Sequence, residues 1–115
     1  MKHAGGCHCG RIAFEVDTGE GIAEVYDCNC SMCRRRGGLL WFVPRNALRL
    51  TSAVADLGTY TFHKHAIHHH FCPNCGMAPF SESADGSSGA SINVRCLDGV
   101  DLSTLEVKHY DGLHR

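Results

Sequence analysis

The sequence predicts a small, mostly β fold with very little helix. Short apolar segments with an alternating pattern recur along the chain, and in each of them every second side chain would lie on one face, as in half-buried strands. Glycine, serine and aspartate, which favour turns, separate these segments. Only two stretches carry helix signals, and both are short.

Seven or eight short strands are expected. The first is RIAFEVD, residues 11–17, in which the apolar side chains alternate. GLLWFVPR, residues 38–45, is apolar almost throughout, and its Trp41 and Phe42 are expected in the core rather than in a substrate platform. The other candidate strands are residues 22–28, 57–64, 66–72, 78–83, 90–96 and 105–111.

The two helix signals each predict a single turn. Ser31 is expected to cap a turn over residues 32–36, which would end at Gly37. Residues 100–105, VDLSTL, could form the second turn. Neither would be a substantial helix.

The chain is expected to form one domain over residues 1–115. A chain of this length buries roughly two thirds of its unfolded surface in one core, and the sequence has no repeat or long linker. The formal charge is -1, so no strong field would steer the chain to nucleic acid or anionic lipid. We therefore expect a small-molecule partner, with neither nucleic acid nor a membrane.

The sequence also indicates a compartment. MKHAGGCHCGRIAFEV has no continuous apolar region typical of a secretion signal, and no segment approaches the ~20 apolar residues that cross a bilayer. A soluble, cytoplasmic protein is expected. Because the cytosol is reducing, the eight cysteines favour metal binding over disulfides.

The cysteines fall into a C-x-C pair, a C-x-C-x-x-C triplet, a C-x-x-C pair and a single residue. In chain order they are Cys7 and Cys9, then Cys28, Cys30 and Cys33, then Cys72 and Cys75, and finally Cys96.

The two pairs together would complete a closed tetrahedral zinc site. In FCPNCG the two thiolates can converge on one ion at roughly 2.3 Å, and glycines flank the pair in GGCHCG. Four thiolates leave no room for a substrate, and they would tie together segments about 65 residues apart. Cys7, Cys9, Cys72 and Cys75 are therefore expected to hold a structural zinc ion.

The triplet is one ligand short of a tetrahedron. Three protein ligands with one exchangeable position are typical of catalytic zinc, so the expected fourth ligand is water or a substrate atom. In the alternative, Cys96 or a histidine of residues 68–70 closes the site and both metals are structural.

An open site with three thiolates points to thiol chemistry. Three thiolates leave the zinc complex with a net charge near -1, which weakens it as a Lewis acid. Coordination would still favour the thiolate form of an incoming thiol, which is the reactive nucleophile. The triplet is therefore expected to serve thiol transfer.

These motifs resemble the glutathione-dependent formaldehyde-activating family, also called the centromere protein V-like family. The resemblance covers nearly all of the chain. It runs through GCHCGRIAFEV, CNCSMCRRRGG, VPRNALRL, HHFCPNCGMAPF and NVRCLDGVDLSTLEV.

The resemblance implies a fold, a cofactor and an activity. The fold is all-β, with small antiparallel sheets held by zinc, similar to a zinc-binding Rab exchange factor (Mss-four-like). Two zinc ions are implied, with the same division of the cysteines. The implied activity is that of a carbon-sulfur lyase, which condenses formaldehyde with glutathione to S-(hydroxymethyl)glutathione. The chain shows no obvious added segment that would hold the tripeptide, so the partners are expected more broadly as a small thiol and a small aldehyde.

Two further groups of residues adjoin these motifs. Arg34, Arg35 and Arg36 follow the triplet and could receive carboxylates of the thiol, or could form a solvated turn end. Strand alternation would place His68 and His70 on one face and His69 on the other. These three histidines therefore cannot all bind one ion, although one of them could carry a proton near the open site.

Three functions remain open on the sequence alone. The first is the enzyme described above, with Cys28, Cys30 and Cys33 as its catalytic site. The second is a non-catalytic binding module in which both zinc sites are closed. The third is an iron-sulfur protein, because four cysteines also bind such clusters.

Overall fold

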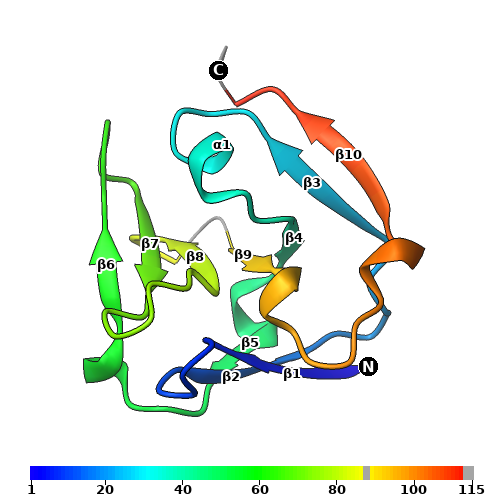
Figure 1. The fold of residues 1–115 in the computed structure, drawn as a ribbon, viewed down its shortest axis with the longest axis horizontal. Coiled ribbons are helices and arrows are strands. Elements are labelled where there is room, and N and C mark those ends of the chain that lie inside the picture. Colours follow the sequence, from blue (N-terminus) through cyan, green and yellow to red (C-terminus); the bar gives the residue numbers. More distant parts are fainter. Residues whose placement is uncertain (87–88, 113–115) are drawn as a thin grey trace.

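Two β-sheets form the frame of the molecule in the computed structural model, which describes residues 1–86 and 89–112 (Figure 1). The smaller sheet is antiparallel and has the strand order β1-β2-β5. It consists of β1 (Lys2–Gly6), β2 (Ala13–Asp17) and β5 (Leu48–Leu50).

The larger sheet has the strand order β10-β3-β4-β9-β8-β7-β6. Its neighbouring strands pair antiparallel, except that β10 pairs parallel with β3. The strands are β3 (Glu24–Cys28), β4 (Leu40–Val43), β6 (Gly58–Tyr60), β7 (Ile67–Phe71), β8 (Phe80–Ser83), β9 (Ala90–Asn93) and β10 (Glu106–Tyr110).

The predicted fold class is confirmed: the chain is mostly β, with largely antiparallel sheets. Each of the eight predicted segments contains a strand, but β1 and β5 were not predicted. The β1 sequence KHAGG has no β-branched or aromatic residue, and β5 has only three residues. Both strands pair with β2, so long-range hydrogen bonding rather than local pattern produces them.

The helical content is as small as expected. α1 (Cys33–Arg36) ends at Gly37, whose N–H donates to the carbonyl of Cys33 at 2.9 Å. The predicted cap was wrong, because Met32 and not Ser31 occupies the N-cap, without a side-chain hydrogen bond. The remaining turns are 3₁₀ helices, namely η1 (Arg45–Ala47), η2 (Val54–Asp56), η3 (Val94–Cys96) and η4 (Leu102–Thr104).

The second predicted turn, at residues 100–105, is η4. The Asp101 carboxylate accepts a hydrogen bond from the Ser103 N–H at 3.0 Å, which satisfies a free donor at the start of the turn. The chain then enters β10, which runs beside β3 along the edge of the larger sheet (Figure 1).

The core lies where side chains of the two sheets meet. Phe14 of β2 and Phe80 of β8 are buried, and their ring centroids are 5.7 Å apart. Burial of each such ring contributes roughly 1.5–3 kcal/mol of transfer free energy. The other buried members of this core are Val16, Val25, Trp41, Val43, Leu48, Ala90, Ile92, Val94 and Leu97.

The neighbouring residues Trp41 and Phe42 lie on opposite faces of β4. Trp41 is buried in the core, as predicted. Phe42 is 52% exposed, so the prediction that it belongs to the core was wrong. Successive side chains of a strand point to opposite faces, and only one face of β4 meets the core here.

Within the described residues, no helix has both the length and the apolar character that crossing a bilayer requires.

Candidate metal centres

The four cysteines of the two pairs form one cluster. Their Sγ atoms all lie within 4.8 Å of one another. Cys7 and Cys9 come from the turn between β1 and β2, and Cys72 and Cys75 come from the turn after β7. The cluster therefore joins the smaller sheet to the larger one, across a long interval of sequence.

Each pair sits in a tight turn closed by backbone hydrogen bonds. The Gly10 N–H donates to the Cys7 carbonyl at 3.3 Å, and the Gly76 N–H donates to the Cys72 carbonyl at 2.7 Å. Both glycines have positive φ, +85° at Gly10 and +82° at Gly76. Other residues rarely adopt this conformation, so these glycines allow each turn to bring its two thiols together.

The sulfur geometry is consistent with a tetrahedral zinc ion. The Cys9 Sγ lies 3.6 Å from both the Cys7 Sγ and the Cys72 Sγ. A tetrahedron with zinc–sulfur bonds of 2.3 Å has edges of about 3.8 Å. The four donors thus already lie near the spacing that such an ion requires.

Backbone donors also favour the thiolate form that a metal needs. The Ile12 N–H donates to the Cys7 Sγ at 3.2 Å. Hydrogen bonds from the backbone of Met77, and then from that of Cys9, lower the pKa of Cys75 to about 6. This cluster is therefore suited to hold a cation.

The triplet forms a second cluster, in which the Sγ atoms of Cys28, Cys30 and Cys33 lie within 4.8 Å of one another. Cys28 is the last residue of β3, and Cys33 is the first residue of α1. The Cys30 N–H donates to the Cys28 Sγ at 3.5 Å, and the Cys33 N–H donates to the Cys30 Sγ at 3.3 Å.

The electrostatics of the triplet indicate a place for a positive charge. Burial raises the pKa of Cys28 and, together with the neighbouring thiols, raises the pKa of Cys33 well above its usual range. At Cys30 burial acts in the same direction, but hydrogen bonds, first from the Cys33 backbone, leave its pKa below the usual value. Three crowded thiols cannot all ionise unless a cation compensates them.

Among residues 1–86 and 89–112, no further cysteine, histidine or acidic side chain joins the three sulfurs as a fourth member of the group. The sequence had offered Cys96 and the histidines of residues 68–70 as closing ligands. None of these lies in the cluster. His114 lies outside the described residues.

A groove of about 350 Å³ opens beside the triplet. Cys33 belongs to its lining, together with the cations Arg36 and Arg95 and with His69 and Cys96. Parts of α1, β8, β9 and the turn near Cys75 also line it. The groove thus places a thiol of the second cluster next to two guanidinium groups and an imidazole.

His69 is the histidine of the HHH run that lines this groove. The predicted alternation is present, since the His68 and His70 rings contact each other with centroids 6.0 Å apart. His69 is buried, and its Nδ1 bonds the Ser81 hydroxyl at 2.9 Å. Burial, and then the charge of Arg36, lower the pKa of His69 to about 4, so its imidazole is neutral near pH 7.

The three arginines after the triplet differ in their positions. Arg36 lines the groove. Arg35 donates from Nη1 to the Ser31 carbonyl at 2.6 Å, which holds it against the preceding loop. Arg34 is exposed and does not line the groove.

Cys96 contacts the groove without joining either cluster. Its Sγ lies 3.7 Å from Nδ2 of Asn93, and burial raises the pKa of its thiol to about 11. A thiol with this pKa is a poor nucleophile at neutral pH. Cys96 is therefore not the closing ligand that the alternative interpretation offered, and its surroundings are those of a small, half-buried side chain.

Sequence reasoning missed Arg95 as a groove residue. Arg95 is an isolated cation in NVRC, and no local pattern marks it. It reaches the groove because η3 follows β9, and β9 pairs with β4 beside the triplet. The alternating pattern of the HHH run did distinguish His69, because it placed this side chain on the opposite strand face from His68 and His70.

The family comparison and a curated relative name the same family. The family described as glutathione-dependent formaldehyde-activating enzyme matches residues 2–110. A Penicillium rubens protein named "Putative glutathione-dependent formaldehyde-activating enzyme" is 31% identical over 78 residues, which are 64% of this chain and 40% of that relative. The chain therefore spans well under half of that protein. A crystal structure of a Rhodobacter sphaeroides protein is 31% identical, with a TM-score of 0.79 over 94% of this chain and 100% of that one.

Proposed function

The chain belongs to the glutathione-dependent formaldehyde-activating enzyme family, as its motifs predicted, and from that premise we propose that it is a zinc-dependent carbon-sulfur lyase. Its reaction joins a thiol to a small aldehyde, or runs in reverse. The class of both substrates follows the family: a glutathione-like thiol, and formaldehyde or another small aldehyde.

One observation carries this proposal. The three sulfurs of the triplet lie together, have no fourth partner among the described residues, and adjoin a groove through Cys33. A purely structural site would need its fourth ligand from the chain. The four-cysteine cluster has that ligand, so we assign Cys7, Cys9, Cys72 and Cys75 to a structural zinc ion and the triplet to the reaction.

The reaction balances without a redox partner. The sulfur–hydrogen bond of the thiol breaks, a bond forms between sulfur and the carbonyl carbon, and the proton ends on the carbonyl oxygen to give a hemithioacetal. A zinc ion held by three thiolates supplies a fourth position that favours the thiolate form of the incoming thiol. Cys28, Cys30 and Cys33 would hold such an ion, and Cys33 lines the groove.

The cationic groove residues would orient the thiol substrate. Arg36 and Arg95 both line the groove, and a glutathione-like thiol carries two carboxylates. Guanidinium groups bind carboxylates through paired, charge-assisted hydrogen bonds. Fixing the carboxylates holds the thiol in place while its sulfur reacts.

His69 would act on the aldehyde oxygen. Its Nδ1 is occupied by Ser81, so Nε2 remains for a ligand in the groove. When the Ser81 hydroxyl donates to Nδ1, the neutral ring carries its proton on Nε2 and can donate a hydrogen bond to the carbonyl. Such a donor stabilises the negative charge that develops on oxygen during attack.

Metal-binding cysteine clusters of this kind are more common in a reducing compartment, and we assign the reaction to the cytoplasm.

The test is the response of the metal to thiols. We expect two metal ions per chain, one for each cluster, and a cobalt-substituted protein whose spectrum changes when glutathione is added. Cys30→Ser should abolish this change and thiol–aldehyde exchange while the first site keeps its metal. Cys96→Ser, which removes a groove thiol that belongs to neither cluster, serves as the matched control.

The outcome that overturns the proposal is a cobalt spectrum that stays unchanged at saturating thiol. The binding module with two closed metal sites would then be the better description.

A further inference from the structure

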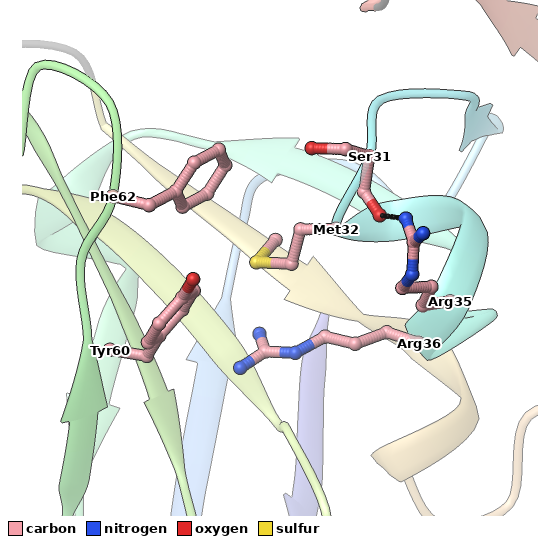
Figure 2. Close-up of a pocket in the computed structure, with 6 residues that line it drawn as sticks. All are labelled: Ser31, Met32, Arg35, Arg36, Tyr60 and Phe62. Carbon is pink, nitrogen blue, oxygen red and sulfur yellow. Dashed lines mark hydrogen bonds between the residues drawn. The ribbon is translucent and has the colours of Figure 1, made fainter.

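A second cavity, of about 430 Å³, adjoins the groove and shares Met32 and Arg36 with it. Two of its lining residues, Ser31 and Met32, lie in the loop between Cys30 and Cys33, so the cavity is next to the triplet. The complete lining is Ser31, Met32, Arg35, Arg36, Tyr60 and Phe62 (Figure 2).

One side of this cavity is aromatic. The rings of Tyr60 and Phe62 are stacked, with centroids 5.7 Å apart and planes inclined by 19°. Phe62 in turn stacks on the groove residue His69 at 5.4 Å and 27°. A row of nearly parallel rings therefore leads from the cavity to the imidazole beside the triplet, and Tyr60 at its outer end is 49% exposed.

The opposite side is cationic. Figure 2 shows the guanidinium group of Arg36 and the sulfur of Met32 pointing toward the two rings, from the other side of the cavity. Arg35 stands beside them, held by Ser31. The ion pairs of residues 1–86 and 89–112 include none of Arg34, Arg35 and Arg36, so no carboxylate of these residues pairs with the cations of the cavity.

We propose that this cavity binds an aromatic carboxylate group carried by one of the two substrates. The flat ring packs against the aromatic side of the cavity that Tyr60 and Phe62 form, and the carboxylate pairs with Arg36. The Met32 sulfur adds a favourable contact at the ring edge. That a substrate carries this group rests on the proposed function, whereas the binding of the group to the cavity does not.

The chemistry of the lining excludes two simpler occupants. Formaldehyde has neither a ring nor a charge, so it would use nothing that the cavity offers. An aliphatic carboxylate would use Arg36 but would leave the aromatic side of the cavity uncovered. Only a ligand with a flat apolar body and a negative end engages both sides of the cavity.

The binding test uses benzoate as the probe, measured by calorimetry on the metal-loaded protein. We expect saturable binding of benzoate, and binding weaker by about tenfold or more for acetate and for benzamide, which lack the ring and the charge respectively. Equal affinity for benzoate and acetate would overturn the proposal, because the rings would then contribute nothing.

Variants locate the binding. Arg36→Gln and the double variant Tyr60→Leu with Phe62→Leu should each weaken benzoate binding by about tenfold. Arg34→Gln, on the same helical turn but outside the cavity, should stay within about twofold. An equal loss in Arg34→Gln and Arg36→Gln would show a general charge effect and would overturn the assignment. Metal content confirms that each variant is folded.

Two further probes distinguish which substrate carries the group. A thiol, 4-(mercaptomethyl)benzoate, should bind more tightly than benzoate if its sulfur reaches the triplet while its ring occupies the cavity. If the aldehyde carries the group, that gain is absent, and 4-formylbenzoate should react with glutathione faster than benzaldehyde does. If benzoate binds but neither compound shows its expected gain, the cavity takes no part in the reaction. That result would overturn the substrate assignment.

The failures of the two proposals can be told apart. A cobalt spectrum that does not change when thiols are added overturns the proposed function. Benzoate binding would still be expected in that case. Conversely, a spectrum that responds to glutathione, in a protein that does not bind benzoate, retains the enzyme and rejects the aromatic cavity.

Discussion

Gly112 lies directly against Cys28: a Cβ atom built on Gly112 would be 2.8 Å from the Cys28 Sγ and 3.1 Å from the Cβ of Cys30. The parallel pairing of β10 with β3 produces this approach, since it sets Tyr110 opposite Cys28. The Asn29 N–H then donates to the Tyr110 carbonyl at 3.1 Å and fixes the chain beyond β10 against the triplet loop.

The first prediction is that Gly112→Ala disturbs the second metal site alone. The added methyl group would crowd Cys28 and Cys30, and either these residues or the chain at Gly112 must shift. Overpacking of this kind costs about 1–3 kcal/mol. We expect cobalt affinity at the triplet to fall by about tenfold or more, while the four-cysteine site is unchanged. A stepwise cobalt titration separates the two sites.

Gly19→Ala is the matched control for this variant, because a Cβ on Gly19 would meet no atom within 4 Å. Its titration should match that of the wild type. If Gly112→Ala behaves in the same way, the C-terminal end of β10 does not constrain the triplet.

The second prediction concerns the structural cluster. Cys72 is fully buried, and its cluster joins the two sheets. Removal of one of four ligands in Cys72→Ser should lower the free energy of unfolding by about 3 kcal/mol or more, because metal binding and folding are coupled. Cys33→Ser at the second cluster should cost clearly less. Urea unfolding of the metal-loaded proteins measures both, and equal losses would contradict the division of roles.

The third prediction follows from the depressed pKa of His69. Burial, with Arg36 nearby, lowers this pKa to about 4 in the folded protein, whereas an unfolded histidine has about 6.5. The unfolded state therefore takes up the proton first as the pH falls, and stability present above pH ~6.5 is lost toward pH ~4. Near pH 5 this loss amounts to about 1–2 kcal/mol.

The measurement compares wild type with His69→Gln by urea unfolding at pH 7 and pH 5. The free energy of unfolding of the wild type, relative to that of His69→Gln, should fall by this amount between pH 7 and pH 5. Loss of metal at acid pH affects both proteins and therefore cancels in the comparison. A constant advantage over His69→Gln would mean that the fold does not hold this imidazole neutral.

The fourth prediction tests the contact between the two sheets. Phe14→Ala removes a buried ring that packs on Phe80, and should cost about 3–5 kcal/mol. Phe42→Ala removes a ring of the same size that is 52% exposed, and should cost less than about 1 kcal/mol. Thermal unfolding of both variants gives the comparison, and similar losses would refute the assignment of Phe42 to the surface.

The sequence by itself determined the fold class and the division of the cysteines. Cysteines two or three residues apart can converge only through a local turn, so Cys28, Cys30 and Cys33 were recognisable as one group from their spacing alone. Alternation likewise placed His69 apart from His70, because the period of a strand is a local property.

Tertiary structure decided which residues distant in the sequence lie close together. β1 and β5 exist because they pair with β2, and Phe42 is exposed because only one face of β4 meets the core. Arg95 reaches the groove beside the triplet from the turn after the inner strand β9, whereas Tyr60 reaches the neighbouring cavity from the edge strand β6. The close approach of Gly112 to Cys28 depends on a parallel pairing between strands about 80 residues apart. Such contacts depend on long-range pairing and packing, whereas spacing and alternation act over only a few residues, so the sequence pattern alone could not place them.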